Sequence, residues 1–491
     1  MAVTVSPSGL VTAVSPGLST ITASHQGVSG AAQVTVSTPP LAAPKAFPSA
    51  QGFGAQSLGG RGGVLLEVTN LNDSGPGSLR AAVDAFGPRT VVFRTGGIIK
   101  LASPLVLRNP YITIAGQTAP GGGIVVTGVP NVNNSLFQII THNFVIRYIR
   151  ARNIASGAPA SGQVNFALIN GAHDGIIDHC SGSWSLDEGF MVWRYQAPPA
   201  PDIANITIQR CIIAEGLAGH STGMLIGGRF DYGVNPPIEE YLKIRQISVH
   251  HNLFVHNYDR NPRATSSGCQ LINNVVYNWG SRVGVSEAKN TIDLINNYWK
   301  PGPMSQNLIY KHEPKHITMG WVYPPPSIYI AGNIVPPVFN NPSADNWPLI
   351  VENVTLALLP LSYRRFTPIS EGPVPVDIQT AANAYASVLA DVGANKRLDG
   401  NGQGVPNYDS VDQRLLTHVM NGTGWSVPVE SPEASGGFPV IAPGVPYPDT
   451  DHDGMSDAWE TAAGLNPTNP GDGNLVGLEG YTNLERFLNG V

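Results

Sequence analysis

Short runs of β-branched and other apolar residues recur through the middle of the chain, and each run ends at or near a polar residue. Runs of this composition, separated by turn residues, predict short β-strands. The predicted strands are Ile112–Ile114, Val145–Arg147, Ile176–Asp178, Ile206–Ile208, Ile247–Val249, Leu271–Asn274, Leu294–Asn297 and Tyr329–Asn333. The pattern therefore predicts a fold built from many short strands.

The spacing of these strands indicates how they are arranged. Asn252, Asn274 and Asn297 lie 22 and 23 residues apart, whereas Cys180, Cys211 and Asn252 lie 31 and 41 residues apart. A minimum period near 22 residues, lengthened by insertions, is typical of a parallel β-helix, in which each coil gives short strands to long parallel sheets. Asparagines stacked at one turn can form a hydrogen-bonded ladder. A β-propeller, the alternative, would show longer and more uniform repeats.

Insertions between the coils of such a solenoid usually project on one face and build the binding site. The long spacings here bracket Gly182–Asn205 and Ala214–Gln246. Directly after the second insertion, Ile247–Arg263 begins as a strand and continues into a loop that carries two arginines. We therefore expect the insertions and the arginine loop to share one cleft.

The arginine loop has the chemistry to bind a carboxylate. Pro262 fixes its own φ and biases Asn261 toward an extended conformation, which stiffens the loop between Arg260 and Arg263. The planar fork of a guanidinium group matches the geometry of a carboxylate. A surface loop with two solvated arginines is the alternative interpretation.

The N-terminal segment has a different pattern. Residues 1–37 predict four short strands separated by Pro, Ser and Gly turns, and residues 38–46 predict an extended linker. The four strands are Val3–Val5, Leu10–Val14, Thr20–Ala23 and Gln33–Val36. The run Ser8–Val36 resembles the C-terminal part of a bacterial Ig-like (group 2) domain. Because such a sandwich needs about seven strands, we expect the chain to begin inside this domain, with any signal peptide out of view.

Two helices are predicted after Asn340, where apolar residues stand three or four positions apart. The first spans Val376–Val392, with Ile378, Ala382, Tyr385 and Leu389 on one face. The second spans Asp409–Met420, with Val411, Leu415 and Val419 on one face. We expect both helices to cover the flank of the solenoid.

The stretch Asp449–Glu460 has the pattern of a twelve-residue calcium-binding loop. Carboxylates stand at loop positions 1, 3, 5, 9 and 12, and a glycine stands at position 6, where the loop turns sharply. The predicted ligands are Asp449, Asp451, Asp453, Asp457, Glu460 and the backbone carbonyl of Met455. The following segment, Gly471–Glu479, lacks alternating carboxylates and is interpreted as a degenerate partner loop.

Composition narrows the class of protein further. The chain has 491 residues with 55 Gly, 42 Pro and only 13% charged residues, which is typical of a turn-rich extracellular β-protein. The net charge of −6 argues against nucleic-acid binding, and no apolar run approaches membrane-spanning length. Cys180, Cys211 and Cys269 cannot all pair and lack metal-ligand spacing, so we expect them to be buried inside strands.

Several stretches resemble the pectate lyase family of right-handed parallel β-helix enzymes. They are Gly59–Gly63 (GGRGG), Val68–Val83 (VTNLNDSGPGSLRAAV), Ile112–Gly123 (ITIAGQTAPGGG), Ile176–Glu188 (IIDHCSGSWSLDE) and His250–Arg263 (HHNLFVHNYDRNPR). The resemblance implies a catalytic β-helix domain over residues 47–445, with a helical extension at about 346–445. Residues 446–491 resemble an EF-hand or dockerin-like calcium module. The expected fold class is all-β: a right-handed parallel β-helix with a partial Ig-like β-sandwich and a small helical calcium-binding module.

The family's reaction is β-elimination on polygalacturonate (pectate), an acidic polysaccharide. A base removes the proton at C5 of a uronate and the glycosidic oxygen on C4 leaves, while Ca²⁺ or arginine neutralises the carboxylate. The resemblance implies that Arg260 is the base and that Arg263 grips the substrate carboxylate. Because arginine normally has a pKa above 12, the base is either a guanidinium with a depressed pKa or one member of a proton relay.

The resemblance also implies a Ca²⁺ cofactor in the cleft, with Asn165, Asp187 and Glu188 as ligands. Asn165 stands where many members of the family have aspartate, and Met191 stands where another carboxylate is expected. With fewer carboxylates, we expect Ca²⁺ to bind mainly together with the substrate. The predicted substrate-binding residues are His220, Arg282 and Lys289.

Two other functions remain open at this stage. A β-helix glycoside hydrolase needs paired carboxylates, and Asp187 with Glu188 is the candidate pair, although neighbours on a strand point to opposite faces. A non-catalytic polysaccharide-binding solenoid on the cell surface is the alternative from another class. The sequence favours a secreted or cell-surface lyase that acts on pectate as a monomer.

Overall fold

The computed structural model of the chain describes residues 3–9, 11–13, 17–36, 44–129, 135–154, 163–194, 201–228, 243–314 and 325–491. They cluster into two compact units, Met1–Pro44 with Leu478–Gly480 and Lys45–Gly477 with Tyr481–Val491. In the first unit, the pairs are antiparallel: β1 (Val3–Val5) with β2 (Val11–Ala13), and β3 (Gly17–His25) with β4 (Val28–Val36). Strands therefore lie where the sequence predicts them, and the partial Ig-like sandwich stays a prediction.

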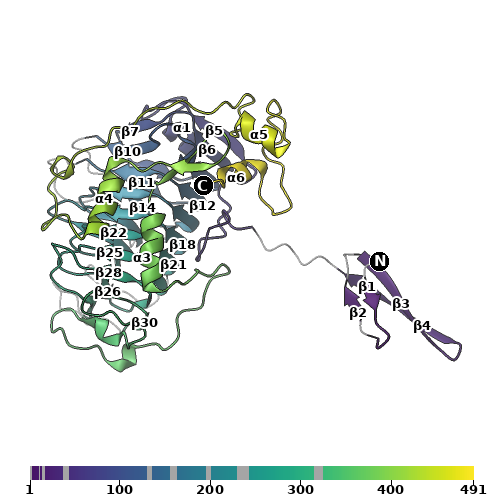
Figure 1. Ribbon diagram of the computed structural model, residues 1–491, viewed down its shortest axis with the longest axis horizontal. Coiled ribbons are helices and arrows are strands. Elements are labelled where there is room, and N and C mark those ends of the chain that lie inside the picture. The colour runs from purple at the N-terminus through teal and green to yellow at the C-terminus, as the bar shows by residue number, and fades with distance from the viewer. Residues whose placement is uncertain are drawn as a thin grey trace. The chain divides into compact units, whose positions relative to one another are not determined.

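The second unit is a parallel β-helix (Figure 1). Within the described residues, its strands form three parallel sheets of ten, eight and nine strands, and from β6 onward the chain visits these sheets in that order, coil after coil. This topology excludes the β-propeller. It also explains the sequence pattern, because all eight strands predicted from the short apolar runs lie in the ten-stranded sheet.

The three sheets are made of the following strands. The ten-stranded sheet contains β5 (Val64–Val68), β6 (Arg89–Phe93), β9 (Ile112–Ala115), β12 (His142–Arg147), β15 (His173–Asp178), β18 (Ile203–Gln209), β21 (Ile244–His250), β24 (Cys269–Ile272), β27 (Thr291–Ile295) and β30 (Ser327–Ala331). The eight-stranded sheet contains β7 (Gly97–Leu101), β10 (Ile124–Gly128), β13 (Arg150–Arg152), β16 (Ser181–Ser183), β19 (Ile212–Ala214), β22 (Leu253–Val255), β25 (Val275–Tyr277) and β28 (Tyr298–Lys300). The nine-stranded sheet contains β8 (Leu105–Leu107), β11 (Phe137–Ile139), β14 (Phe166–Ile169), β17 (Glu188–Arg194), β20 (Thr222–Gly228), β23 (Arg263–Ala264), β26 (Val285–Glu287), β29 (Tyr310–Glu313) and β31 (Ile350–Glu352).

The register of the ten-stranded sheet stacks one aliphatic side chain on the next through the interior. The stack is Ile114, Ile146, Ile177, Ile208, Val249, Leu271, Leu294 and Ile330, each paired with its neighbour in the next coil. All of these residues belong to the main hydrophobic core. A shift by one residue would turn the whole stack outward, so burial of this row fixes the register.

The predicted asparagine ladder is present at the turn from the ten-stranded to the eight-stranded sheet. Nδ2 of Asn252 donates to Oδ1 of Asn274 at 3.0 Å, and Asn274 donates in the same way to Asn297 at 3.1 Å. The ladder continues from Asn297 to Asn333 and from Asn333 to Asn346, at 2.9 and 3.0 Å. Each of these amides bonds backbone groups as well, which satisfies polar atoms that the buried turn would otherwise leave without partners.

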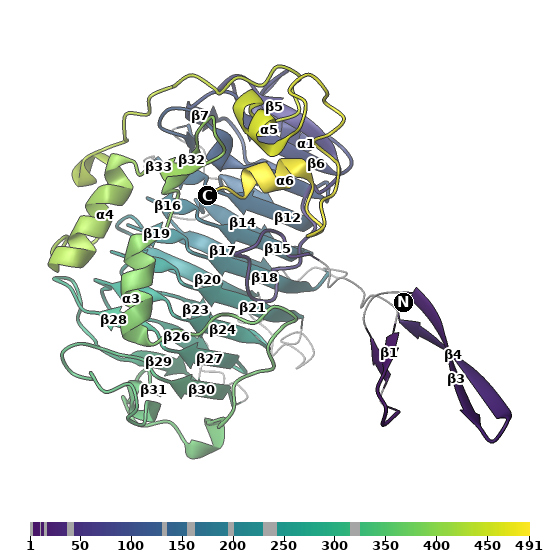
Figure 2. The same cartoon turned by 45° about the vertical axis from the view of Figure 1, so that its right-hand side comes forward.

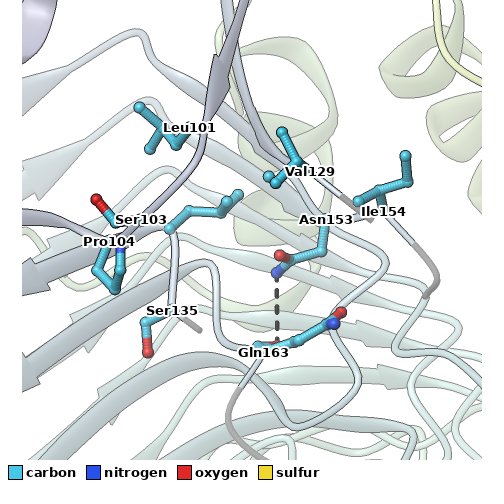
Figure 3. A pocket seen from close by; sticks show the side chains of 10 residues that line it. Leu101, Ser103, Pro104, Val129, Ser135, Asn153, Ile154 and Gln163 are labelled. Carbon is cyan, nitrogen blue, oxygen red and sulfur yellow. Dashed lines mark hydrogen bonds between the residues drawn. The ribbon is translucent and has the colours of Figure 1, made fainter. Parts of the chain in front are cut away.

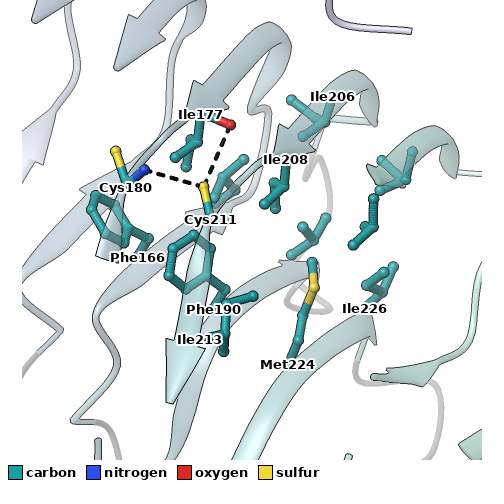
Figure 4. Close-up of a cluster of buried hydrophobic side chains, with 14 of the residues drawn as sticks. Phe166, Ile177, Cys180, Phe190, Ile206, Ile208, Cys211, Ile213, Met224 and Ile226 are labelled. Carbon is teal, nitrogen blue, oxygen red and sulfur yellow. Dashed lines mark hydrogen bonds between the residues drawn. The ribbon is translucent and has the colours of Figure 1, made fainter. Parts of the chain in front are cut away.

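Cysteine replaces asparagine in two coils of this turn. The Asn252 side chain accepts from the backbone N–H of Cys211 at 2.8 Å, and the N–H of Cys180 donates to Sγ of Cys211 at 3.4 Å. Both thiols, and that of Cys269, are buried and free. Figure 4 shows Cys180 and Cys211 beside Phe166, Phe190 and the isoleucines of the core. The prediction that the cysteines are buried is confirmed, although Cys180 and Cys211 lie just before strands rather than inside them.

Two helices lie beside the strands of the eight-stranded sheet, α3 (Ala381–Ala390) and α4 (Ser410–Asn421), as Figure 2 shows. The bounds and buried face of α4 match the prediction, with Val411, Leu415 and Val419 buried. The predicted first helix is wrong in both length and face. Helix α3 begins after the N-cap Thr380, and it buries Ala381, Ala384 and Val388, whereas Ile378 lies outside the helix and is 42% exposed.

The shorter α3 has a specific cause. The backbone carbonyl of Gln379 accepts from the side chains of Asn273 and Asn296, both at 2.7 Å, and its N–H donates to Asn273. The turn of the β-helix therefore holds the backbone before Thr380 in a non-helical conformation. The flank position of both helices, which the sequence predicts, is confirmed by their shared apolar cluster with Ile212, Leu253 and other residues of the eight-stranded sheet.

The remaining α-helices and the β32–β33 pair lie at the first coils of the β-helix. Helix α1 (Leu79–Asp84) joins the end of the main core. The last elements of the chain are β32 (Lys396–Leu398), β33 (Gly404–Pro406), α5 (Asp457–Ala463) and α6 (Asn483–Leu488). Short 3-10 helices are η1 (Gly116–Thr118), η3 (Trp347–Leu349), η4 (Leu361–Tyr363) and η5 (Glu433–Ser435). In the described part of the chain, no helix has the length and apolar character needed to cross a membrane.

Candidate active site

Charged side chains gather outside the nine-stranded sheet, at and near the ends of its strands. We call them the arginine site, made of Asp187, Glu188, His220, Asp259, Arg260, Arg263, Arg282, Glu287 and Glu313. They come from β17, β23, β26, β29, the turns before these strands and, for His220, the turn before β20. The β-helix thus brings together residues that are far apart in the sequence, because successive coils place their strands side by side.

Each arginine of the site is held by carboxylates. Arg260 contacts Glu188, and Nε of Arg263 donates to Glu287 at 2.6 Å. Arg282 donates from Nε to Asp259 at 2.9 Å and also contacts Glu313. The side chains of Arg260 and Arg263 are only 19% and 16% exposed, which excludes the alternative of a loop with two solvated arginines.

Close packing of neighbouring coils positions Arg260. Its backbone lies in the left-handed region at φ 59°, and its N–H donates to Oδ1 of Asp259 at 2.7 Å. Its carbonyl accepts from the N–H of Met224 in β20 at 2.7 Å. A Cβ on Gly223 would come within 2.8 Å of the Arg260 carbonyl oxygen and 2.5 Å of the Asn261 side chain, so only glycine allows this approach.

The acidic end of the site is compact. One potential ligand atom from each of Asp187, Glu188 and His220 lies within 4.8 Å of the other two, and His220 Nδ1 is 3.1 Å from Asp187 Oδ1. Burial and a hydrogen bond with Asp187 raise the pKa of Glu188 to about 7, against the opposing charge of Arg260. The sequence predicts that Asp187 and Glu188 point to opposite faces of a strand. This expectation is wrong, because β17 begins at Glu188 and Asp187 lies in the turn before it.

These residues fit a calcium ion. Carboxylate oxygens are the ligands that Ca²⁺ prefers, and here Asp187 and Glu188 offer them from adjacent positions. Glu188 is 2% exposed, and burial raises its pKa, so a nearby cation would stabilise its charged form. His220 is placed beside Asp187, where it can orient that carboxylate.

Of the other predicted residues, Asn165 lies in the coil next to Glu188, and its backbone N–H donates to the carbonyl of Gly189 at 3.0 Å. Asn165 is fully buried, and its Nδ2 donates to the carbonyls of Ala151 and Ser183 at 3.0 and 3.1 Å, so its amide holds a turn between sheets. Lys289 follows β26, whereas Arg282 precedes that strand. Within the described residues, the side chain of Lys289 makes no hydrogen bond or ion pair. Met191 is 7% exposed in an outer apolar cluster with Val164, Ala167, Trp193 and Leu225.

Sequence reasoning missed the carboxylates that hold the arginines, Asp259, Glu287 and Glu313. Asp259 adjoins Arg260 in the sequence and could have been suspected. Glu287 and Glu313 could not, because they reach the site only through the pairing of β23, β26 and β29. These carboxylates also affect the pKa of Arg282. Burial alone would lower this pKa, but Asp259 and Glu313 hold it above its ordinary value.

At the C-terminus, the predicted calcium loop is folded around its carboxylates. Ligand atoms of Asp449, Asp451 and Asp453 lie within 4.8 Å of one another, and so do those of Asp453, Glu460 and Asp472. Asp457, a predicted ligand, instead accepts from the N–H and the hydroxyl of Thr450, both at 2.8 Å. The Met455 side chain is fully buried. Asp472 lies in the segment interpreted as degenerate, so the loop pattern alone could not identify it.

A separate small pocket, drawn in Figure 3, lies at the ends of β7 and β10. Its cavity volume is about 10 Å³, and it is lined by Leu101, Ser103, Asn153, Gln163 and their neighbours. A cavity of this size holds about one water molecule. The pocket is therefore too small for a sugar.

The fold and the site define a β-solenoid with paired charges outside one sheet. The chain is 32% identical over 453 residues to a probable pectate lyase C of Neosartorya fischeri, covering 91% of this chain and 93% of that protein. It is 34% identical over 459 residues to a probable pectate lyase C of Aspergillus terreus, with 91% and 94% covered. The chain belongs to the pectate lyase family.

No family model matches the chain. Among solved structures, the chain is similar to jun a 1, the major allergen from cedar pollen, with 17% identity and a TM-score of 0.48 over 70% of this chain and 92% of that chain.

Proposed function

We propose that this protein cleaves pectate by β-elimination at the arginine site. The observation that carries the proposal is the contact of Arg260 with Glu188, beside the paired Arg263 and Arg282, in a chain of the pectate lyase family. Each uronate of pectate carries a carboxylate, which a guanidinium group matches in charge and geometry. Substrate carboxylates would exchange with the protein carboxylates that hold these arginines in the free enzyme.

In the proposed reaction, Arg260 passes one N–H proton to Glu188 and, as a neutral guanidine, accepts the proton from C5 of a uronate. The electron pair of the C–H bond forms the double bond between C4 and C5, and the bond from C4 to the glycosidic oxygen breaks, with the leaving oxygen protonated by solvent. The Glu188 contact supports a proton relay at Arg260, because a carboxylate touching the guanidinium gives the proton a path away from it. Arg263 and Arg282 hold substrate carboxylates in position.

Asp187 and Glu188 are the residues that we propose to hold Ca²⁺, with His220 orienting Asp187. The bound ion would neutralise the uronate carboxylate and so make the C5 proton more acidic. At this end of the site, two carboxylates face one arginine and one histidine, so a bound cation would offset their negative charge toward an acidic polymer. Asn165 and Lys289 are not part of the proposed group.

One assay tests the proposal against its two alternatives. Polygalacturonate is incubated with the full chain, with Ca²⁺ or with excess EDTA. A lyase gives products with ultraviolet-absorbing unsaturated ends, and here only with Ca²⁺. Reducing ends without that absorbance would indicate a glycoside hydrolase, and no product would indicate a binding protein. The adjacent Asp187 and Glu188 do not favour a hydrolase, because Glu188 is buried against Arg260.

The remaining expectations follow from this function. We propose that the protein is secreted or held at the cell surface, because its polysaccharide substrate lies outside the cell. We also propose that it acts as a monomer.

A further inference from the structure

Five carboxylates meet against the first coils of the β-helix, and we call them the acidic cluster: Asp449, Asp451, Asp453, Glu460 and Asp472. Several of their oxygens are buried without any hydrogen-bond partner: both of Asp451, both of Glu460, Oδ2 of Asp453 and Oδ1 of Asp472. Glu460 has no exposed surface, and Asp453 and Asp472 are 6% and 5% exposed. Burying carboxylates without partners is costly, so these atoms indicate a cation between them.

The backbone is shaped to bring these oxygens together. Gly454 has φ 92° at the sharp turn of the loop. A Cβ on Gly473 would lie 2.8 Å from Oδ2 of Asp453, so glycine lets the second segment approach the loop. Oδ2 of Asp472 accepts from the N–H of Asn466 at 3.1 Å, which leaves its Oδ1 facing the cluster. A pocket lined by His452, Asp453 and Gly473 opens beside the cluster and gives an ion access from solvent.

The same loop is fastened to the edge of the β-helix. Arg94, which follows β6, lies 3.4 Å from both Asp449 and Glu67, and Glu67 of β5 is also 3.2 Å from His452. Met455 packs in an apolar cluster with Val92 and Ala115 of the ten-stranded sheet and with α6 residues. These contacts lie on the outer face of the ten-stranded sheet at its first strands, so the loop covers side chains of β5 and β6 there.

We propose that the acidic cluster binds one Ca²⁺ ion, which fastens the C-terminal segment onto the first coils of the β-helix and so stabilises the β-helix itself. All-oxygen ligands suit Ca²⁺, which takes six to eight of them. The ligand set differs from the linear loop pattern, because Asp472 takes part and Asp457 does not. The proposed role also differs from that of a separate calcium module. Loss of Ca²⁺ from a separate module would unfold that module alone, whereas loss of Ca²⁺ here would lower the stability of the β-helix.

Three substitutions in the full chain test the ligand set. Glu460→Gln and Asp472→Asn each remove one ligand charge, and Asp457→Asn is the matched control, because Asp457 binds Thr450 instead. Tightly bound Ca²⁺ is measured by calorimetric titration without polysaccharide, after EDTA treatment and washing. We expect about one tight ion in the wild type and in Asp457→Asn, and binding weaker by about tenfold or more in the other two.

The stabilisation is measured as the difference in unfolding temperature of the β-helix with Ca²⁺ and with EDTA. The difference is used because removing a carboxylate also relieves repulsion in the metal-free protein, which would raise its unfolding temperature independently of Ca²⁺. We expect Ca²⁺ to raise the unfolding temperature of the wild type and of Asp457→Asn, and to have little effect on Glu460→Gln and Asp472→Asn. Unchanged Ca²⁺ binding by Asp472→Asn would overturn the ligand set, and an ion that binds without shifting β-helix unfolding would overturn the fastening role.

Discussion

Glu188 and Arg260 are 72 residues apart in the sequence, and their side chains are in contact. Glu188 begins β17, and Arg260 lies in the turn that leads to β23. The contact joins the proposed base to a proposed calcium ligand. A change at either residue is therefore expected to affect both the proton transfer and the binding of the ion.

Arg260→Lys is expected to lower kcat by about 10²–10⁴-fold, the usual contribution of a general base. The lysine keeps a positive charge beside the buried Glu188, so the fold should survive. Arg414→Lys is the matched control, because Arg414 binds the fully buried Glu215 on the flank of the β-helix in the same manner. Initial rates on polygalacturonate and unfolding temperatures are compared. Near wild-type turnover by Arg260→Lys would show that Arg260 is not the base.

Asp187→Asn is expected to raise the Ca²⁺ concentration needed for half-maximal activity by about tenfold or more, since it removes a ligand charge. The control is Asp345→Asn, which removes an exposed carboxylate that pairs with Arg364. Activity is titrated against free Ca²⁺ for both variants. Full wild-type activity in excess EDTA would contradict a calcium site at Asp187 and Glu188.

Asn274→Ala is expected to destabilise the β-helix by about 2–4 kcal/mol, because it leaves several buried donors and acceptors without partners. Asn274 bonds Asn252, Asn297 and the carbonyl of Val249. Asn340→Ala is the control, since Asn340 makes an exposed bond to the carbonyl of Pro337. Thermal unfolding compares the two variants. Equal unfolding temperatures would mean that the ladder adds little to stability.

The buried group of Asp178, Arg147 and His179 predicts how stability depends on pH. Burial alone would raise the pKa of Asp178, but His179 and Arg147 hold it well below its usual range. Its stabilising effect is therefore present above the unfolded pKa of about 4 and is lost as the pH falls below it. Burial would lower the pKa of His179, but Asp178 and Asp391 raise it. Its stabilising effect is full below about pH 6.5 and is lost as the pH rises through the raised value.

Stability from this group should therefore be greatest between about pH 4 and 6.5. Asp178→Asn should weaken the dependence on pH on both sides, since it removes the partner of Arg147 and of His179. Unfolding temperatures of the wild type and Asp178→Asn are measured across this range. Curves of the same shape for the two proteins would contradict the assignment.

The sequence predicts the fold well where a residue type repeats at each coil. Asn252, Asn274 and Asn297 occupy equivalent turns, and their spacing alone predicts the ladder that the structure contains. The apolar runs likewise predict the strands of the ten-stranded sheet, because one buried row sets both composition and register. Local patterns were less informative for α3, whose start depends on Asn273 and Asn296 from distant coils.

Some residues of the arginine site and of the acidic cluster could not be predicted, because they also depend on contacts between distant parts of the chain. Glu287 and Glu313 reach the arginine site only because insertions of unequal length still place β26 beside β23 and β29 beside β26. Asp472 reaches the acidic cluster through a turn outside the twelve-residue pattern. Contacts of this kind depend on the three-dimensional path of the chain, which a linear motif does not encode.

The most direct test of the central claim follows the bond changes themselves. Polygalacturonate labelled with deuterium at C5 is cleaved by the full chain with Ca²⁺, and the products are analysed by mass spectrometry and ultraviolet absorbance. The proposed β-elimination predicts that the new non-reducing end loses its C5 deuterium and carries an absorbing double bond, and that Arg260→Lys forms this product far more slowly. Products that keep the C5 deuterium and have gained the elements of water would contradict the account.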